Sequence, residues 1–254
     1  MNPSGQAALV TGAASGLGEA TARELARLGA KVAVLDVNMA LAEKVAAEIG
    51  GVACQCDITN PDSVSASIAK AAAAHGPARI LMNVAGIGGA KRVVQKDGSA
   101  APLDAFAKVI AVNLIGTYNM TRLFAAACAQ LEPQDGGERG VILFTASVAA
   151  FDGQVGQQAY SASKGGLVGM TLPMARDLAQ HGIRVCTIAP GLFATPLMQE
   201  LPEAVQASLA ASIPFPSRLG KPSEFAELAA HVVTNGHLNG EVIRLDGALR
   251  MAPR

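Results

Sequence analysis

The residues best suited to chemistry are a tyrosine and a lysine four positions apart. Tyr160 and Lys164 open a predicted helical segment, where this spacing places both side chains on one face. A phenol has a pKa of about 10, so proton exchange near neutral pH requires a lower value. Lowering it by about 2 to 3 units takes about 3 to 4 kcal/mol, and an ammonium about 4 Å away supplies energy of that order. The pair is a candidate acid/base, although a solvated helix face would show the same spacing.

A second segment has the composition of a phosphate-binding turn. Thr11–Gly18 (TGAASGLG) follows a predicted strand and precedes a predicted helix. Its glycines allow backbone N–H groups to approach a pyrophosphate, and the helix directs its positive end at that charge. The spacing G-x-x-x-G-x-G differs from the G-x-G-x-x-G fingerprint. Taken alone, the segment also fits a glycine-rich turn that only packs helix against strand.

Asp36 stands at the end of the next predicted strand, 18 residues after Gly18. A carboxylate there accepts hydrogen bonds from both hydroxyls of an adenosine ribose. It repels a 2′-phosphate, because two like charges about 4 Å apart at an effective dielectric of about 20 cost about 4 kcal/mol. No Arg or Lys stands at positions 12–18 or 36–43 to offset that repulsion. The sequence therefore predicts NAD rather than NADP as cofactor, with a turn or cap role for Asp36 as the alternative.

These residues need a scaffold that brings distant segments together. Predicted helices near Leu17–Leu28, Ala40–Ile49, Asp62–His75, Leu103–Gln130, Ala159–Gln180 and Ser223–Thr234 alternate with seven short apolar runs. The runs are Ala7–Val10, Lys31–Leu35, Val52–Cys56, Ile80–Val84, Val141–Thr145, Val185–Ile188 and Val242–Leu245. Strands separated by helices pair in parallel through right-handed crossovers. We therefore expect an α/β fold in which a doubly wound, seven-stranded parallel sheet carries helices on both faces.

Two segments interrupt the alternation. Gly88–Pro102 is polar and glycine-containing, and Gly191–Arg218 carries four prolines. In an open parallel sheet, ligands bind beyond the carboxyl ends of the strands, where both segments begin. We expect an insertion at 88–102 and a substrate loop at 191–218 within one domain over residues 1–254; ordinary surface loops are the alternative.

Composition excludes several classes of protein. Twenty basic and twenty acidic side chains cancel, so the charge excess of a nucleic-acid binder is absent. Half of the 254 residues are hydrophobic, too many for a disordered chain, yet no apolar run is long enough for a membrane span. The cysteines (Cys54, Cys56, Cys128 and Cys186) lack the spacing of a metal site. The first residues show no secretory signal, and we expect a cytoplasmic protein with reduced thiols.

Several ordered motifs resemble the short-chain dehydrogenase/reductase family. They are Thr11–Gly18, Asn83–Gly86 (NVAG), Asn113, Ser147 with Tyr160 and Lys164, and Pro190–Gly191, which together cover essentially the whole chain. The resemblance implies a Rossmann fold and an NAD-dependent enzyme. Longer segments are similar to a branch of the family that acts on 3-hydroxyacyl-CoA and hydroxysteroids. These are Thr145–Gly153, Gln154–Gln157, Tyr160–Pro173, Ile188–Thr195, Pro214–Gly220 and Leu238–Arg250.

The resemblance also implies roles for individual residues. Tyr160 is the expected acid/base, Lys164 lowers its pKa and holds the nicotinamide ribose, and Ser147 orients the substrate oxygen. Asn113 is the expected fourth catalytic residue, whose backbone helps to hold a water in the proton relay. Gln154 is a candidate for the substrate pocket. The other cofactor-binding residues implied are Gly12, Ser15, Leu17, Asp36, Asp57, Ile58, Val84, Phe193 and Thr195.

The expected reaction interconverts 3-hydroxyacyl-CoA and 3-oxoacyl-CoA by hydride transfer, with tyrosine acid/base catalysis. An NAD-dependent hydroxysteroid or secondary-alcohol dehydrogenase is the alternative. A non-catalytic scaffold is a remote one, because it predicts loss of Ser147, Tyr160 or Lys164. Lys91, Arg92 and Lys96 form a basic cluster in the insertion that can meet coenzyme A phosphates or simply be solvated.

The expected partners are a small-molecule substrate and further copies of the chain, with no metal, nucleic acid or membrane. The segments Leu103–Gln130 and Ala159–Gln180 are rich in small residues, which permit close approach of helices across a two-fold axis. Kinship adds that family members pair such helices, so we expect a homotetramer. The small residues fit burial inside a single chain equally well.

Overall fold

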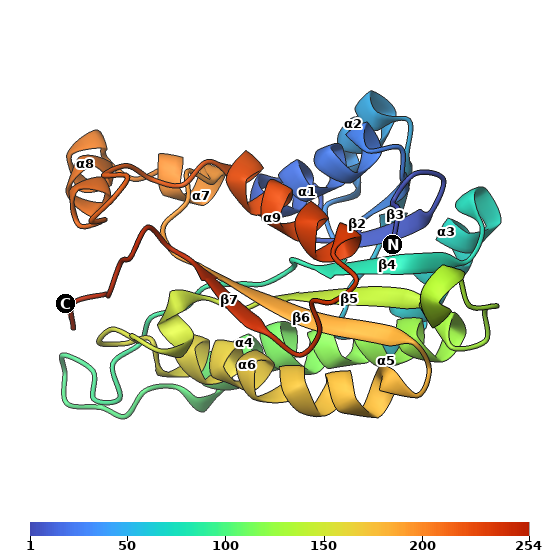
Figure 1. Cartoon of the computed structure of the whole chain (residues 1–254). Coiled ribbons are helices and arrows are strands. Elements are labelled where there is room, and N and C mark those ends of the chain that lie inside the picture. Colours follow the sequence, from blue (N-terminus) through green and yellow to red (C-terminus); the bar gives the residue numbers. More distant parts are fainter. Residues whose placement is uncertain (254) are drawn as a thin grey trace.

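Seven parallel strands form one sheet in the computed structural model, which describes residues 1–253 (Figure 1). The strand order is β3-β2-β1-β4-β5-β6-β7, so the chain reverses its direction of travel between β1 and β4. The predicted doubly wound sheet is therefore confirmed. The strands are β1 (Ala7–Thr11), β2 (Lys31–Asp36), β3 (Val52–Gln55), β4 (Ala78–Asn83), β5 (Gly140–Thr145), β6 (Ile183–Pro190) and β7 (Val242–Leu245).

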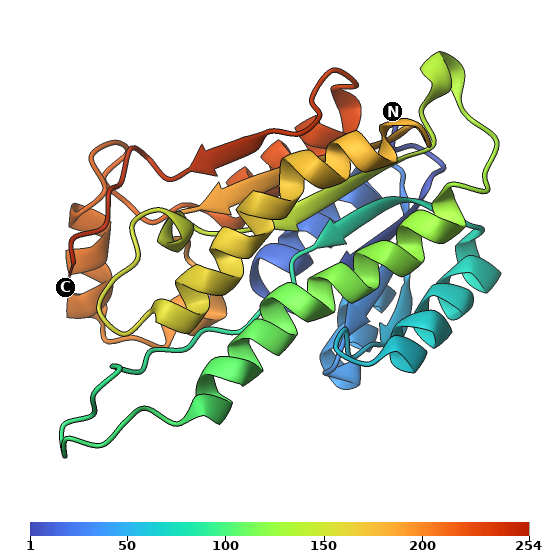
Figure 2. The same ribbon diagram turned by 90° about the horizontal axis from the view of Figure 1, so that it is seen from below.

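Helices cover both faces of this sheet (Figures 1 and 2). One face carries α1 (Gly16–Arg27), α2 (Met39–Ile49) and α9 (Pro222–Thr234); the other carries α3 (Pro61–His75), α4 (Leu103–Ile110), α5 (Thr117–Cys128) and α6 (Gln158–Ala179). Alternate residues of the strands feed the two cores: in β5, Val141 and Leu143 face one core, while Ile142 and Phe144 face the other. Burial on both faces explains why these strands read as continuous apolar runs.

The long helix expected over Leu103–Gln130 consists of three segments. Between α4 and α5 the backbone forms a π-helix, η1 (Ala111–Gly116), and α5 ends at Cys128. Single π turns inside α-helices are rare and occur often at functional sites. No residue type in this stretch marks a π turn, which is why the sequence does not reveal it.

The two long segments between elements lie beyond the carboxyl ends of β4 and β6. The insertion forms a hairpin with an antiparallel bridge between Val94 and Ala100. The loop after β6 contains two helices that the sequence did not predict, α7 (Pro196–Gln199) and α8 (Glu203–Ala211). In Figures 1 and 2 the insertion, α8 and the end of the chain all lie at this same end of the sheet.

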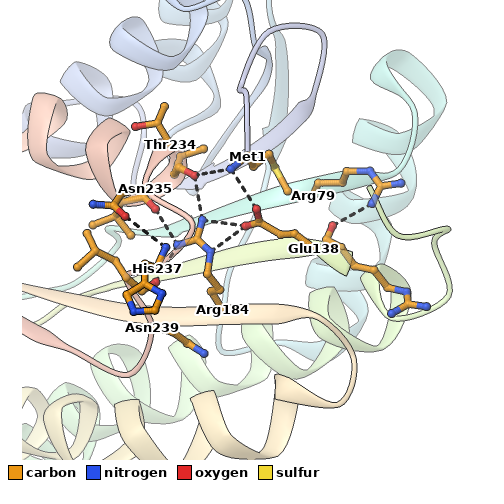
Figure 3. Close-up of polar contacts among 12 residues, drawn as sticks. Met1, Arg79, Glu138, Arg184, Thr234, Asn235, His237 and Asn239 are labelled. Carbon is orange, nitrogen blue, oxygen red and sulfur yellow. Dashed lines mark hydrogen bonds and ion pairs between the residues drawn. The ribbon is translucent and has the colours of Figure 1, made fainter. Parts of the chain in front are cut away.

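An ion pair between the buried Arg184 and the partly buried Glu138 closes the opposite end, where β5 and β6 begin (Figure 3). The guanidinium group of Arg184 lies 2.8 Å from a carboxylate oxygen of Glu138 and donates to the carbonyls of Val232, Val233 and Leu238. The ammonium group of Met1 lies 3.0 Å from the other Glu138 oxygen. These contacts link β5, β6 and α9 at the amino end of the strands.

Some classes of site are absent from residues 1–253. No helix in this range is long and apolar enough to cross a membrane. The same residues contain no group of three His, Cys, Asp or Glu side chains arranged to hold a metal ion. The four cysteines are free and buried, and burial raises the pKa of Cys56 and of Cys128 to about 11.

Candidate active site

The strand order reverses at the ends of β1 and β4, and there the two following loops touch. The hydroxyl oxygen of Thr11 accepts hydrogen bonds from the N–H groups of Val84, at 3.1 Å, and Ala85, at 3.2 Å. Gly12 has a φ of +64°, and a Cβ there would lie 2.7 Å from the Cα of Ala85. Only glycine permits this approach. The loop after β4 is thus held against the start of the glycine-rich turn.

The glycine-rich turn leads directly into α1. A Cβ on Gly18 would lie 2.1 Å from the carbonyl oxygen of Gly12, so glycine is needed for the helix to pack on its own turn. The side chain of Ser15 makes no capping hydrogen bond. The first N–H groups of α1 therefore remain available to an anion, at the positive end of the helix. This donor set fits a pyrophosphate.

Asp36 both supports the turn and lines the cleft beside it. Its carboxylate accepts hydrogen bonds from the N–H groups of Ala14, at 3.1 Å, and Asn38, at 2.9 Å. The turn role and the ribose role of Asp36 therefore do not exclude each other. The cleft has a volume of about 410 Å³. Of the predicted cofactor residues, it brings together Gly12, Ser15, Leu17, Asp36, Asp57, Ile58, Val84 and Thr195.

A second cavity adjoins this cleft and contains the catalytic candidates. Ser147, Tyr160 and Lys164 line it together with Phe193, and Thr195 belongs to both cavities. Ser147 follows β5 and begins the short 3-10 helix η3 (Val148–Ala150), where its hydroxyl accepts a hydrogen bond of 3.1 Å from the N–H of Ala149. Phe193, the remaining predicted cofactor residue, therefore lies beside the catalytic candidates.

Lys164 is buried and its ammonium group is held by the backbone. Its Nζ donates a 2.6 Å hydrogen bond to the carbonyl oxygen of Thr145 and lies 5.7 Å from the ring centroid of Tyr160. Burial lowers the pKa of Lys164 to about 8, because transfer out of water disfavours the charged form. The side chain can thus change its charge in the physiological range.

Tyr160 shows a shift opposite to the one expected from the residue pair. Burial raises the pKa of Tyr160, and its hydrogen bond with Ser147 acts in the opposite direction but more weakly. The reason is that burial penalises the charged phenolate more than the neutral phenol. The chain by itself therefore favours the neutral phenol, which is the form that donates a proton.

Asn113 lies in the π-helix η1 and is fully buried. Its side-chain oxygen accepts from the N–H of Ile87 at 2.8 Å, and its amide donates to the Ile87 carbonyl at 2.9 Å and to the hydroxyl of Ser163 at 3.1 Å. A Cβ on Gly86 would lie 3.2 Å from this side-chain oxygen and 3.4 Å from the Nζ of Lys164. Asn113 therefore ties the loop after β4 to α6, and Gly86 leaves room for both side chains.

Gln154 lies apart from these cavities. Its side-chain amide donates to the carbonyl of Ala252 at 3.0 Å, and its backbone N–H donates to the side chain of Gln157 at 3.0 Å. It is not among the residues that line the cleft or the catalytic cavity. The structure therefore gives Gln154 a contact with the C-terminal segment rather than a place beside Tyr160.

Sequence reasoning missed two contributors to this site. Thr11 was treated only as the start of the turn, although its hydroxyl holds the loop after β4. Met198, from α7, lines the catalytic cavity and was not singled out. The signal for Thr11 was a hydroxyl residue at the end of a buried strand, whereas no sequence signal marked Met198.

Comparisons with known proteins agree with this geometry. A family model described as short chain dehydrogenase matches residues 6–206. The 3-hydroxyacyl-CoA dehydrogenase type-2 of Rattus norvegicus is 53% identical over 252 residues, which cover 98% of this chain and 97% of that protein. The protein of the same name from Homo sapiens is 52% identical over 252 residues, with the same coverage.

Solved structures extend the similarity to three dimensions. The crystal structure of 3-hydroxyacyl-CoA dehydrogenase type-2 from Mycobacterium avium has a TM-score of 0.95 at 47% identity and covers 98% of both chains. The structure of 3-ketoacyl-(acyl-carrier-protein) reductase from Brucella melitensis complexed with NADH has a TM-score of 0.87 at 33% identity, covering 98% of this chain and 99% of that one.

Proposed function

The chain belongs to the short-chain dehydrogenase family of oxidoreductases, and from that premise we propose that it interconverts 3-hydroxyacyl-CoA and 3-oxoacyl-CoA with NAD. The observation that carries the proposal is one cavity lined by Ser147, Tyr160 and Lys164 beside the cleft that the glycine-rich turn and Asp36 line. The names of full-length relatives at 52% and 53% identity support the acyl-CoA substrate. A scaffold without catalysis gains no support, because all three side chains are present.

We assign the following roles in oxidation. Tyr160, as phenolate, takes the proton of the C3 hydroxyl while the C3–O bond becomes a carbonyl; in reduction it returns that proton. Ser147 donates a hydrogen bond to the same oxygen and so orients it. A dinucleotide held in the cleft would supply the redox chemistry, as acceptor or donor of the C3 hydride.

Lys164 completes the acid/base unit in this proposal. Its ammonium hydrogen-bonds a ribose hydroxyl of the cofactor and lowers the pKa of Tyr160 through its charge. Burial alone raises the pKa of Tyr160, so the lowering needs the bound complex. We retain Asn113 as the fourth member, with its backbone holding a relay water next to the π turn.

NAD rather than NADP is the proposed cofactor. A nicotinamide cofactor is supported by the family match and by the NADH complex of the Brucella melitensis structure. The preference for NAD rests on Asp36, which lines the cleft and repels a 2′-phosphate. Gly12, Ser15 and Leu17 would hold the pyrophosphate. Asp57, Ile58, Val84, Phe193 and Thr195 would complete the site.

We propose one functional unit over residues 1–254, in which 88–102 and 191–218 form the walls of the substrate site. Lys91, Arg92 and Lys96 line a shallow exposed pocket on the insertion and are the proposed contacts for coenzyme A phosphates. Neutralising all three should raise the KM for acetoacetyl-CoA. An unchanged KM would assign them to a solvated loop.

A homotetramer in the cytoplasm completes the proposal. Ile115, Tyr118 and Leu172 leave large side chains exposed on η1, α5 and α6, where a second copy of the chain could cover them. A monomeric mass in sedimentation at micromolar concentration would contradict it. Four free, buried thiols fit a reducing compartment, and cell fractionation tests the location.

The decisive experiment measures NADH consumption with acetoacetyl-CoA and with a panel of oxosteroids, in the wild type and in Tyr160→Phe. We expect turnover of acetoacetyl-CoA and a loss of about 10²- to 10⁴-fold in kcat for the variant, because a positioned acid/base contributes about that much. NADH binding, followed by its fluorescence, should persist. Tyr118→Phe is the matched control, because Tyr118 is the second tyrosine and is 49% exposed. Turnover of steroids alone would overturn the acyl-CoA assignment.

A further inference from the structure

Ser163 is a buried hydroxyl residue of α6 that the proposed mechanism does not use. It lies three residues after Tyr160 and directly before Lys164. Its side chain is 0% exposed, and it lines neither the cleft nor the catalytic cavity. The hydroxyl of Ser163 therefore acts on the site only through other residues of the protein.

This hydroxyl takes part in two hydrogen bonds at once. It donates its proton to the carbonyl oxygen of Tyr160 at 2.8 Å, and its oxygen accepts from the side-chain amide of Asn113 at 3.1 Å. A hydroxyl has one proton to donate and lone pairs that accept, so both bonds form together. The bond to Tyr160 stays within one helical turn, whereas the bond from Asn113 joins positions 50 residues apart. Ser163 thus connects the first turn of α6 to the π-helix η1.

Asn113 extends this connection to the loop after β4. Its side-chain oxygen accepts from the N–H of Ile87 at 2.8 Å, and its amide donates to the carbonyl of Ile87 at 2.9 Å. Ile87 in turn lines both the dinucleotide cleft and the catalytic cavity. One series of hydrogen bonds therefore runs from the wall of the cleft, through Asn113 and Ser163, to the backbone of Tyr160.

Burial makes this series of bonds hard to replace. Asn113 and Ser163 are both 0% exposed, so bulk water does not reach the amide that Ser163 accepts from. A buried donor that loses its acceptor is costly, and its neighbours shift to relieve it. A displacement of about 1 Å of a reacting group can lower a rate by about 10²-fold. The backbone of Tyr160 is thus held where a small movement would be felt by its phenol.

We propose that Ser163 is a positioning residue, whose hydroxyl holds Tyr160 in register with Asn113 and the loop after β4. The inference rests on the proposed role of Tyr160 as the acid/base. Loss of the hydroxyl should impair proton transfer by the phenol and so lower kcat. It should leave cofactor affinity in place, because the glycine-rich turn and Asp36 belong to the other half of the sheet.

The test compares Ser163→Ala with Ser161→Ala. The hydroxyl of Ser161 is also buried next to Tyr160, but within residues 1–253 it has no hydrogen-bond partner. Both variants therefore remove a buried hydroxyl from the same turn, and only Ser163→Ala removes hydrogen bonds. We expect kcat with acetoacetyl-CoA to fall about tenfold in Ser163→Ala, while the KM and the Kd for NADH stay within about twofold. Ser161→Ala should match the wild type in all three quantities.

A spectroscopic measurement follows Tyr160 without relying on turnover. The chain has two tyrosines and no tryptophan, so the background Tyr118→Phe leaves Tyr160 as the one phenol whose ionisation changes the ultraviolet absorbance. With NAD present, we expect Ser163→Ala to shift this titration to higher pH, because the phenol is less well aligned with Ser147, whose hydrogen bond lowers the pKa of Tyr160. Ser161→Ala in the same background should leave the titration unchanged.

The remaining outcomes decide against the inference or against the function separately. Equal effects of the two alanine variants, or an unchanged kcat in Ser163→Ala, reject the positioning role. A parallel loss of kcat and NADH affinity, with an unchanged titration, rejects it too and assigns Ser163 to the stability of the fold. Turnover of neither acetoacetyl-CoA nor oxosteroids by the wild type rejects the proposed function. The titration of Tyr160 then decides the inference alone: a shift in Ser163→Ala supports it, and no shift rejects it.

Discussion

Lys164, the lysine of the proposed acid/base unit, is a costly side chain for the fold to hold. Lys164 is 4% exposed, and its one polar contact with the protein is the hydrogen bond from Nζ to the Thr145 carbonyl. Burial lowers its pKa from the usual 10.5 to about 8. Active sites often contain buried ionisable groups of this kind, which lower the stability of the fold but serve the reaction.

The lowered pKa of Lys164 predicts a pH-dependent cost in stability. Between about pH 8 and 10.5 the unfolded chain holds this proton and the folded chain has released it, so stability rises with pH in that window. Against Lys164→Met, which lacks the titration, the wild type should gain about 2 kcal/mol in unfolding free energy from pH 7 to pH 10. Urea unfolding at four pH values measures this difference.

The comparison with Lys164→Met removes contributions from the other ionisable groups, since both proteins contain them. Tyr160 in particular titrates in both, and burial raises its pKa in the direction that lowers stability at high pH. Parallel stability curves for the two proteins would show that Lys164 is not penalised by burial. The variant should also lose activity while it retains its fold.

In the proposed function, Asp36 sets the preference for NAD over NADP. Asp36→Asn removes the charge but keeps an oxygen that can accept from the N–H of Asn38, so the turn should persist. We expect the ratio of kcat/KM for NAD to that for NADP to fall by about tenfold or more, because the repulsion of the 2′-phosphate is lost.

Asp62→Asn serves as the control for the cofactor experiment, because Asp62 is exposed at the start of α3 and does not line the cleft. An unchanged cofactor ratio in Asp36→Asn would leave Asp36 with its turn role alone. A loss of activity with both cofactors would indicate that the turn had been disrupted.

Candidate site residues could be predicted from the sequence where they lie close together in it. Tyr160 and Lys164 share a helix face, and Gly12 and Gly18 share a turn, so spacing alone related them. Contacts between distant segments were invisible: the hydroxyl of Thr11 meets the N–H of Val84 across 73 positions of sequence. The contact between Gln154 and Ala252 could not be predicted for the same reason, because it depends on the path of the C-terminal segment.

At the level of elements, the sequence predicted the strands well and the irregular helices poorly. Strands buried on both faces read as continuous apolar runs, and β2 and β5 were predicted to within one residue at either end. No sequence feature marks the π turn at η1. Helix α8 lies in a proline-rich segment, and prolines are typical of loops. Irregular backbone is set by tertiary contacts, such as those of Asn113 with the Ile87 backbone.

Strand β7 and the segment after it hold the loop between Ser147 and Tyr160. Arg244 of β7 lies 2.6 Å from a carboxylate oxygen of Asp152, and its guanidinium stacks 5.1 Å from the ring centroid of Phe151. The N–H of Val155 donates to the carbonyl of Pro253 at 3.0 Å. Arg244 lowers the pKa of Asp152, which keeps this carboxylate ionised. The catalytic loop is therefore anchored at its middle.

Arg244→Gln should loosen that loop and act on turnover rather than on cofactor binding. We expect kcat to fall by about tenfold, because small displacements of positioned groups are costly, while the Kd for NADH stays within about twofold. Arg250→Gln is the control, since Arg250 is 62% exposed in its side chain and contacts Asp246 at 3.3 Å. Equal loss of kcat and NADH affinity would instead point to a general change of fold.

At the scale of the whole molecule, the candidate active site lies at the carboxyl ends of the strands and the ion pair of Arg184 and Glu138 lies at their amino ends. The strand order followed from no local pattern, because it depends on which strands meet across the sheet. At the amino end, Arg184 is 7% exposed and joins Glu138 to the carbonyls that end α9 (Figure 3). Nothing in the sequence around Arg184 distinguished it from a surface arginine.

Arg184→Gln should lower the free energy of unfolding without changing the geometry of the candidate active site. The loss should be about 3 kcal/mol, near the lower end for breaking a buried pair, because the carbonyls of Val232 and Leu238 lose their donor while Glu138 keeps the Met1 ammonium. Urea unfolding should show this loss at pH 7, and kcat per folded molecule should be unchanged. Arg176→Gln on the exposed face of α6 is the control. Partial recovery in the double variant Arg184→Met, Glu138→Leu would attribute the loss to the unpaired charge.

The four buried thiols allow local unfolding of the unmodified protein to be measured. A thiol-reactive dye needs a thiolate in contact with water, and Cys54, Cys56, Cys128 and Cys186 meet neither condition while the fold is closed. The rate of labelling of the unmodified enzyme therefore measures how often β3, α5 and β6 separate. Cys56 also lines the dinucleotide cleft, so added NAD should slow labelling at this cysteine most.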